Sequence, residues 1–165
     1  EWTNLSTGAY AVYDDDSVNA EIYGNLYNWY AVDDIRGLCM EGWHVATDDE
    51  WTIMTDYLGG IDVAGGKMKS TGTIENGDGL WLSPNSGATN ESMFTGFPSG
   101  ARMTSGDFLN KSKYGYFWTS TIETVHTGNA ESRSLNFNGA GISGGHENSG
   151  ISSKYKGYSI RCVAD

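Results

Sequence analysis

A complete signal for the start of a helix begins at Thr47, and it constrains the fold more than any other feature of the chain. Thr47 is a favoured N-cap residue, and Glu50 follows three positions later, as in a capping box. Two aspartates between them place negative charge at the positive end of the helix dipole. The pattern predicts a helix that begins after Thr47 and ends at Gly59-Gly60.

Apolar residues follow this signal at helical spacing, and they are Trp51, Met54, Tyr57 and Leu58. We expect all four to form the buried face of the helix. The acidic residues of the first turn also match the carboxylate pair of a glycoside hydrolase. Because capping and the helix dipole account for them, we interpret these carboxylates as structural.

The chain has two cysteines, Cys39 before the capped helix and Cys162 in the last strand-like segment. Two cysteines are too few for a disulfide-rich scaffold or for a structural zinc site. We predict a Cys39–Cys162 disulfide, which implies an oxidising, extracytoplasmic setting. Two buried free thiols are the alternative.

Other segments predict a single domain over residues 1–165 of the α+β class. Leu26, Trp29 and Tyr30 have helical spacing and predict a first helix over residues 25–35. Apolar alternation predicts strands over four segments, residues 7–13, 114–121, 131–137 and 157–163. The 23 glycines predict many tight turns and long loops between these elements.

Composition bears on partners. The net charge of −11 argues against nucleic acid and anionic lipid as partners, although six cations could line one positive cleft: Arg102, Lys111, Lys113, Arg133, Lys154 and Lys156. We expect no membrane insertion, because no apolar run approaches the roughly 20 residues of a membrane span. The chain begins at Glu1, so we expect a mature or excised part of a longer protein. Six Trp and ten Tyr exceed the needs of a core of this size, which predicts exposed aromatic rings.

An ordered set of motifs covers roughly residues 21–165. It consists of residues 23–29 (YGNLYNW), 37–60, 64–69 (AGGKMK), 81–85 (WLSPN), 87–90 (GATN), 94–102 (FTGFPSGAR), 115–121 (GYFWTST) and the Cys162 terminus. In these motifs the chain resembles the Fibrobacter succinogenes major paralogous domain, a family found in secreted and surface proteins of Bacteroidetes and Fibrobacteres. The chain departs from the family pattern at Met40 and Ala46, where proline is common, and in the run from Phe97 to Arg102.

The resemblance implies a C-type-lectin-like fold related to formylglycine-generating enzymes, with two helices packed on short antiparallel sheets and long loops. Family members often accompany polysaccharide-degrading enzymes, which implies a carbohydrate-binding module tethered to a catalytic or surface domain. The two cysteines match the structural pair of the family rather than reactive cysteines, so the formylglycine-generating activity is not carried over.

The residues themselves give little support to catalysis or metal binding. His44 lies in an apolar run and is interpreted as a hydrogen-bonded core histidine, whereas His126 and His146 lie in polar loops without a nucleophile nearby. We expect no enzyme activity, no metal site and no cofactor. Calcium is the open alternative, because residues 14–16 and 75–79 supply hard oxygen ligands on turns.

Sugar binding requires flat apolar rings flanked by polar side chains. We assign Trp29, Trp43 and Trp51 to the core and expect a ligand surface made of Trp81, Arg102, Tyr114, Tyr116, Trp118, Glu123, His126, Arg133, Asn136, Lys154 and Tyr155. The strand alternation leaves a core position open for Trp118. For a carboxylated or sulfated ligand, Arg102, Arg133 and Lys154 are the expected partners.

We therefore predict a secreted or cell-surface, non-catalytic module that binds a polysaccharide or oligosaccharide. One alternative is a protein-binding adhesion module at the cell surface. The other is a hydrolase or lyase that uses acidic loop residues. The sequence leaves open whether the glycan is neutral or anionic.

Overall fold

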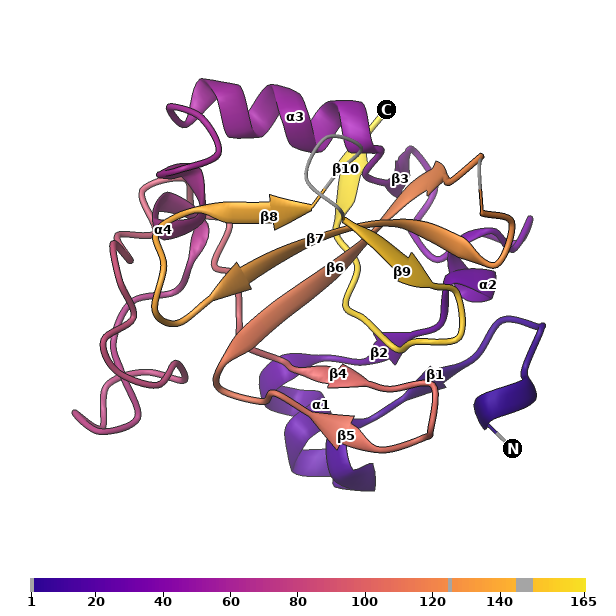
Figure 1. Ribbon diagram of the computed structural model, residues 1–165, viewed down its shortest axis with the longest axis horizontal. Helices are drawn as coiled ribbons and strands as arrows, with labels where there is room; N and C mark the ends of the chain where they lie inside the picture. The colour runs from indigo at the N-terminus through magenta and orange to yellow at the C-terminus, as the bar shows by residue number, and fades with distance from the viewer. Residues whose placement is uncertain (1, 125, 145–149) are drawn as a thin grey trace.

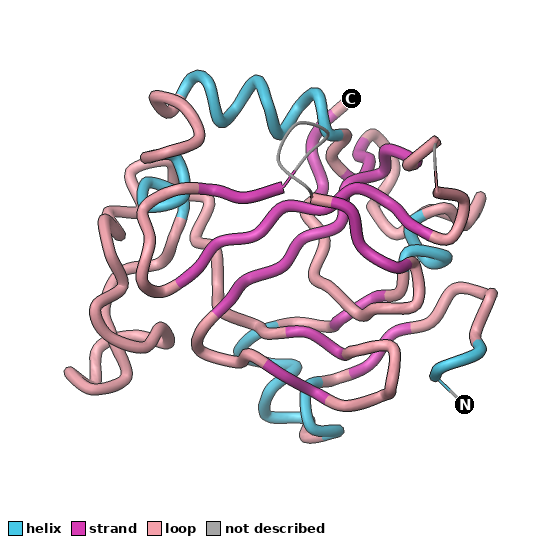
Figure 2. The backbone as a smooth tube through the Cα atoms, in the orientation of Figure 1, coloured by secondary structure: helices cyan, strands magenta, loops and turns pink. Residues whose placement is uncertain are grey.

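The computed structural model describes residues 2–124, 126–144 and 150–165. Long loops join short elements (Figures 1 and 2). The helical elements are η1 (Trp2–Asn4), η2 (Tyr13–Asp15), α1 (Ser17–Tyr23), α2 (Trp29–Val32), α3 (Asp48–Tyr57) and α4 (Ala64–Met68). The strands are β1 (Tyr10–Ala11), β2 (Leu26–Tyr27), β3 (Trp43–Val45), β4 (Ala101–Arg102), β5 (Phe108–Leu109), β6 (Tyr114–Ile122), β7 (Asn129–Asn136), β8 (Ile142–Gly144), β9 (Ile151–Ser153) and β10 (Cys162–Ala164). Within the described ranges, no helix is long and apolar enough to cross a membrane.

A four-stranded antiparallel sheet forms the centre of the molecule, with β7 between β6 on one side and β8 and β9 on the other. Three two-stranded antiparallel sheets, β1–β2, β3–β10 and β4–β5, surround it. In Figure 1, α3 lies above the central sheet, and β4, β5 and α1 lie below it. The structure is therefore a mixed α/β fold with few helices and short antiparallel sheets.

The two faces of the central sheet pack on different clusters. On the face toward α3, Phe117 and Leu135 join Trp51, Met68 and Trp81 in the larger core cluster. On the other face, a second cluster contains Trp29, Trp118 and Tyr158. Successive side chains of a strand point to opposite faces, so Phe117 and Trp118 belong to different cores.

The predicted capped helix is confirmed as α3. The Thr47 hydroxyl accepts a hydrogen bond from the Glu50 amide at 3.2 Å, and the Glu50 carboxylate accepts one from the Thr47 amide at 2.8 Å. The two bonds satisfy donors that the first turn of a helix leaves without partners. The chain leaves the helix through Leu58 and then Gly59, whose φ of 102° suits glycine.

The prediction of a buried position was wrong for one residue of the helix. Trp51 and Leu58 are buried and Met54 is partly buried, but Tyr57 is 89% exposed. An α-helix turns by about 100° per residue, which places Tyr57 about 120° away from Trp51 around the axis. Tyr57 therefore lies outside the arc that faces the core.

Three other predicted elements are shorter than expected. Residues 25–35 do not form one helix, because Leu26 and Tyr27 pair with β1 and the Asn28 side chain caps α2 by accepting from the Ala31 amide. The strand predicted over residues 7–13 is reduced to β1, since Tyr13 begins η2. Residues 157–159 make isolated bridges to three different segments, so only β10 remains of the last predicted strand.

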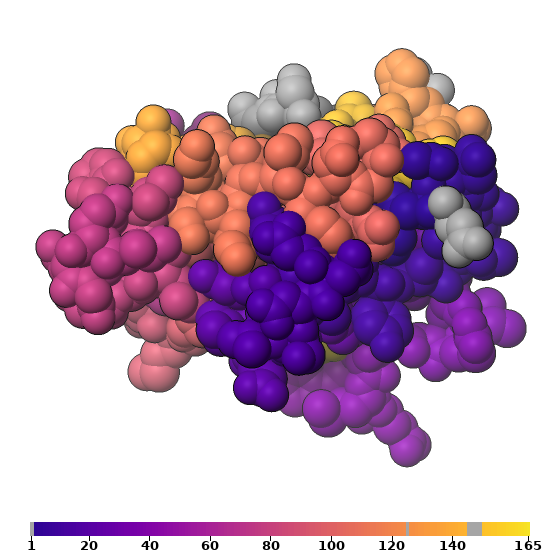
Figure 3. Space-filling view, turned by 90° about the horizontal axis from the view of Figure 1, so that it is seen from below, coloured from indigo at the N-terminus to yellow at the C-terminus, as the bar shows by residue number. Residues whose placement is uncertain are grey.

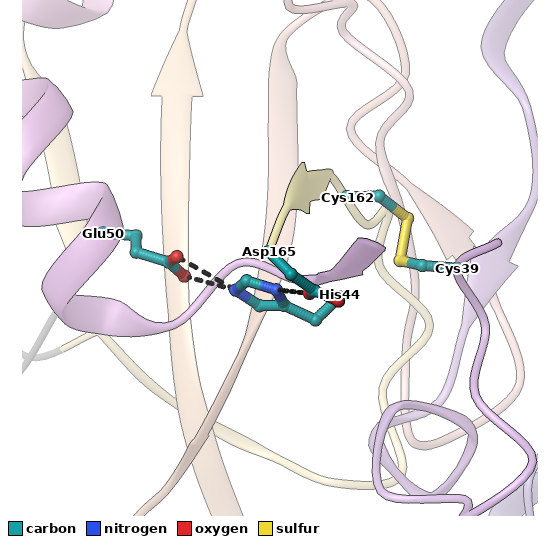
Figure 4. The surroundings of a disulfide bond; sticks show 5 residues. All are labelled: Cys39, His44, Glu50, Cys162 and Asp165. Carbon is teal, nitrogen blue, oxygen red and sulfur yellow. Dashed lines mark hydrogen bonds and ion pairs between the residues drawn. A yellow bond between two sulfur atoms is a disulfide. The ribbon is translucent and has the colours of Figure 1, made fainter. Parts of the chain in front are cut away.

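The Cys39–Cys162 disulfide is present, with the two Cα atoms 5.9 Å apart (Figure 4). It lies where β10 pairs with β3, with Cys162 opposite Val45. The prediction of a core position for Trp43 was wrong, because its side chain is 44% exposed. Among the described strands, β3 pairs with β10 alone, and Trp43 lies opposite Ala164 at the edge of this two-stranded sheet.

Figure 3 shows the lower face of the molecule, where the N-terminal segment in indigo lies beside the region of β4 and β5. Ring and cation contacts join these segments. The rings of Tyr13 and Phe108 are 5.1 Å apart, and the Arg102 guanidinium lies 4.6 Å from Trp2 and 5.0 Å from Phe108. The N-terminal segment thus holds the β4–β5 hairpin beneath the central sheet.

Candidate functional site

Strand register gathers hydroxyl side chains on the lower face of the central sheet. Tyr116 on β6 lies opposite Ser134 on β7, and Ser134 lies opposite Ser143 on β8. Residues opposite one another across antiparallel strands point to the same face. Ser132, two positions before Ser134, shares this face, as does Ser152 on β9 through its pairing with Ala130.

A cavity of about 230 Å³ lies between this face and the segments below it. The sheet contributes Tyr116 and the serines, and the β4–β5 hairpin and the segment after β9 close the other side. The described residues of the lining are Ala101, Met103, Asn110, Tyr116, Ser132, Ser134, Ser143, Gly144, Gly150, Ser152, Lys156 and Tyr158. Pockets for drug-sized ligands measure about 300–1,000 Å³, so this cavity fits one small polar unit or the end of a longer chain.

Stacked tyrosines form one wall of the cavity. The rings of Tyr114 and Tyr116 are 5.4 Å apart and 10° from parallel, and those of Tyr116 and Tyr158 are 4.9 Å apart and 14° from parallel. Tyr158 also lies 4.5 Å from the buried Trp118 ring. Tyr116 is thus held between two rings and presents its edge and hydroxyl rather than a free face.

The tyrosine hydroxyls are fixed and stay neutral. The Asn110 amide donates to the Tyr116 hydroxyl at 3.0 Å, and the hydroxyls of Tyr158 and Ser152 are 3.0 Å apart. Burial raises the pKa of Tyr116 to about 12 and also raises the pKa of Tyr158. Both phenols therefore remain protonated near neutral pH and act as donors as well as acceptors.

The serines of the cavity differ in whether their hydroxyls form hydrogen bonds within the protein. The Ser132 hydroxyl donates to the Gly150 carbonyl at 2.9 Å, and Ser152 is paired with Tyr158. Within the described part of the chain, no residue forms a hydrogen bond with the side chain of Ser134 or Ser143. These two hydroxyls line the cavity and are available to a ligand.

Lys156 is the single charged residue among the described residues of the lining. Its ammonium lies 5.9 Å from the centre of the Tyr158 ring. Burial lowers the pKa of Lys156, because a half-buried charge loses part of its hydration. No described Asp or Glu lines the cavity.

Two of the candidate surface aromatics are buried, so the prediction was wrong for Trp81, whereas Trp118 takes the core position that the strand alternation left open. Trp81 and Trp118 are each 0% exposed. The Trp81 indole donates to the Ser70 hydroxyl at 3.1 Å, and the Trp118 indole donates to the Tyr27 carbonyl at 2.8 Å. Each ring belongs to a core cluster, which removes it from any ligand platform.

Arg133 and Glu123 are also buried rather than ligand-facing, at 4% and 3% exposure. The Arg133 guanidinium donates to the Asp48 carboxylate at 2.9 Å, to the Asp48 carbonyl at 3.1 Å and to the Thr52 hydroxyl at 2.8 Å. Arg133 alternates with the cavity serines along β7, so it points to the opposite face, toward α3. It ties the sheet to that helix and is not available to an anionic ligand.

The other predicted cations do not meet in one cleft. Arg102 lies between Trp2 and Phe108, as described above, and Lys154 lies 4.4 Å from the Trp29 ring. Lys111 donates to the Asn19 side chain at 3.2 Å and lies 4.9 Å from the Tyr13 ring. Of the six cations considered from the sequence, Lys156 alone lines the serine and tyrosine cavity.

The remaining predicted site residues lie in different places. Tyr114 stacks against Tyr116, and Asn136 lies opposite Tyr114 on the same sheet face, half-buried. Tyr155 packs against Tyr30 at 5.5 Å, and His126 is exposed in the loop between β6 and β7. Neither of these two lines the cavity. His146 lies outside the described residues.

Sequence reasoning missed Tyr158 and the serines of β7 as site residues. The alternation Ser132, Arg133, Ser134, Leu135 was the available signal, because it places two hydroxyls on one face of a strand and an arginine and a leucine on the other. No sequence signal singled out Lys156, since its position depends on how the segment after β9 folds back beneath the sheet.

The acidic turns considered for calcium bind their own backbone. The Asp16 side chain accepts from the Val18 amide at 3.0 Å as the cap of α1. Glu75 accepts from the Ser83 amide at 2.9 Å, and Asp78 accepts from the Thr73 amide at 2.8 Å. In the described ranges, no group of three or more His, Cys, Asp or Glu side chains is placed to hold a metal ion.

His44 is not a core residue, because its side chain is 39% exposed. It is hydrogen-bonded as predicted, with Nδ1 2.7 Å from an Asp165 oxygen and Nε2 2.9 Å from a Glu50 oxygen (Figure 4). The two carboxylates, Asp165 first and then Glu50, raise the pKa of His44. This bridge joins β3, α3 and the end of the chain, and it is separate from the cavity.

Comparison with known proteins gives one match. A family model described as the Fibrobacter succinogenes major domain matches residues 1–164. No curated protein and no solved structure matches the chain.

Proposed function

The chain belongs to the Fibrobacter succinogenes major domain family, and we propose that it is a non-catalytic module that binds a polysaccharide or oligosaccharide in the serine and tyrosine cavity. The observation that carries the proposal is the lining, in which six hydroxyl side chains face one small space: Ser132, Ser134, Ser143, Ser152, Tyr116 and Tyr158. Hydroxyl groups both donate and accept hydrogen bonds, as the hydroxyls of a sugar do.

The shape of the cavity also suits a sugar. The edges of the Tyr116 and Tyr158 rings give the lining an apolar part beside which the C–H groups of a sugar ring can lie, and the serines line the sheet side. The volume of about 230 Å³ suits one sugar unit or the end of a chain. A longer glycan would extend from the open side of the cavity.

The lining favours binding over hydrolysis. Glycoside hydrolysis uses a pair of carboxyl groups beside the scissile bond. None of the described residues that line the cavity is an Asp or Glu. We therefore assign no catalytic step to this site.

The proposal also includes the cellular location of the protein and a more specific fold class. The disulfide supports a secreted or cell-surface location, since disulfides persist in oxidising compartments. We propose a C-type-lectin-like fold, supported by α3 packed on a short antiparallel sheet and by a disulfide that joins the last strand to an early loop. The module would be tethered to a catalytic or surface domain of a longer protein.

Affinity electrophoresis against a panel of neutral and acidic polysaccharides tests the proposal. We expect retardation by at least one polymer and its loss in Ser143→Leu, because leucine at this exposed strand position fills the cavity without entering a core. Ser6→Leu, an exposed serine outside the cavity, is the matched control and should bind as the original chain does. If Ser143→Leu still binds the polymer, the binding site lies outside this cavity.

Protein binding is the second candidate, and exposed apolar side chains near the disulfide favour it. Ile35, Met40 and Trp43 flank Cys39 in sequence and are 103%, 72% and 44% exposed. Exposed apolar residues that gather in one region mark interaction surfaces. The absence of retardation by every polysaccharide, together with saturable binding to a surface protein that Trp43→Ser weakens, would favour this function.

A further inference from the structure

We infer that the cavity selects an acidic sugar, one carrying a carboxylate or a sulfate, and that Lys156 is the residue that recognises the anionic group. This inference rests on the proposed carbohydrate-binding function and adds the charge class of the ligand. It starts from the position of Lys156 in the cavity lining, next to Tyr158.

Lys156 carries a half-buried ammonium that has no counter-ion among the described residues. Among the described residues, none forms an ion pair with it or accepts a hydrogen bond from its side chain. The chain has 21 acidic residues against 10 basic ones, so carboxylates are the more abundant charge. A cation that lines a cavity and has no acidic partner among the described residues is placed to meet an anion from outside.

The two fully buried cations Lys69 and Arg133 are satisfied internally. The fully buried ammonium of Lys69 donates to the carbonyls of Ser86, Asn136 and Gly139 at 2.9, 2.8 and 2.9 Å. Arg133 is paired with Asp48. Buried charges normally have such partners, whereas Lys156 is only half-buried and has none among the described residues.

Hydroxyls in the same cavity complete a site for an anion. Ser134 and Ser143 line the cavity together with Lys156, and their hydroxyls have no partner among the described residues. Oxygen atoms of a carboxylate or sulfate accept hydrogen bonds from hydroxyl and ammonium groups, and such charged hydrogen bonds are stronger than neutral ones. A neutral sugar would leave the ammonium of Lys156 unpaired.

The test compares acidic polysaccharides with the same polymers after their charge is removed. The probes are polygalacturonate and alginate with their carboxyl-reduced forms, and carrageenan with its desulfated form, in affinity electrophoresis. We expect at least one acidic polymer to retard the domain and its neutral form to do so about tenfold less or more weakly still, as the loss of a charged hydrogen bond implies. Added salt should weaken the acidic interaction.

Lys156→Gln should weaken binding to the acidic polymer by about tenfold or more and leave binding to the neutral form unchanged. Lys67→Gln is the matched control, because it removes the same charge from α4, on the other face of the sheet, and should bind normally. Equal retardation by charged and neutral forms, or by neutral polymers alone, would overturn the inference and leave the proposed sugar binding intact. Retardation by no polymer contradicts both.

The melting temperature is a second readout, and it distinguishes a ligand-binding role of Lys156 from a structural one. Holding an unpaired ammonium in the cavity costs folding free energy, so Lys156→Met should keep or raise the melting temperature while it weakens acidic-sugar binding. A clear fall in melting temperature with unchanged binding would show that Lys156 supports the fold instead.

Discussion

Three cations, two of them buried and one half-buried, differ in their partners. Lys69 is enclosed by three carbonyls, and burial lowers the pKa of its ammonium to about 8. Arg133 is enclosed by Asp48 and Thr52 of α3. Lys156 has no such partners among the described residues. Two of the three cations therefore hold elements together, and we propose that the third binds a ligand.

Arg133→Ala should destabilise the protein by about 3–5 kcal/mol, because it leaves the Asp48 carboxylate buried without its partner. Chemical denaturation followed by tryptophan fluorescence measures the change. Arg36→Ala is the control, since the Arg36–Asp34 pair lies at the surface and such pairs contribute little to stability. Equal effects of the two variants would mean that Arg133 does not hold β7 to α3.

At the scale of elements, side-chain hydrogen bonds supplement strand pairing that is very short. β3 and β10 form a sheet of only three residues each, and His44 adds bonds from β3 to Glu50 on α3 and to Asp165 after β10. The raised pKa of His44 means that the folded state binds its proton more tightly than the unfolded state. The contribution of this bridge is thus complete below the ordinary value of 6.5 and is lost as the pH rises through the raised pKa.

His44→Gln should therefore lower the melting temperature most at about pH 5.5 and by progressively less toward about pH 9. Glu50 remains ionised over this range, because the hydrogen bonds from Thr47 and His44 lower its pKa below 4.5. Thermal unfolding of both proteins at matched ionic strength gives the difference. A difference that grows with pH would contradict the assigned bridge.

Elements with local signals were predictable, and those that depend on distant contacts were not. The capping box spans only Thr47 to Glu50, and it is enough to indicate where α3 begins. The alternation of apolar residues indicated most of β6 and β7. Tyr114 and Tyr116 were expected at the ligand surface because the chain is rich in aromatic residues and both lie on a predicted strand. Trp81 was misplaced and Trp118 was left open, because the burial of a ring depends on the segments that cover it, such as the Tyr27 segment beside Trp118. Lys156 lay beyond local reasoning for the same reason.

Over the whole molecule, the disulfide joins residues 123 positions apart and closes most of the chain into one loop. In the chain-entropy model, closing a loop of this length stabilises a protein by about 4–5 kcal/mol. Trp29, on α2, belongs to a core cluster with Trp118 and Tyr158 of the second half of the chain, so packing and the disulfide act together.

Cys39→Ser should lower the melting temperature under oxidising conditions by the loss of this constraint. The cavity lies apart from the disulfide, so the ligand preference should stay the same. Reductant is the control, because it should bring the original chain to the stability of the variant. If the variant and the oxidised chain unfold at the same temperature, the disulfide contributes no stability.

The site itself is tested most directly by amide chemical shifts in a titration with the polysaccharide fragment that retards the domain most. We predict shifts concentrated at Ser132, Ser134, Ser143 and Ser152, on the lower face of the central sheet, with Tyr116 and Lys156 among the affected residues. Shifts confined to the region of Ile35, Met40 and Trp43 would contradict the cavity as the binding site.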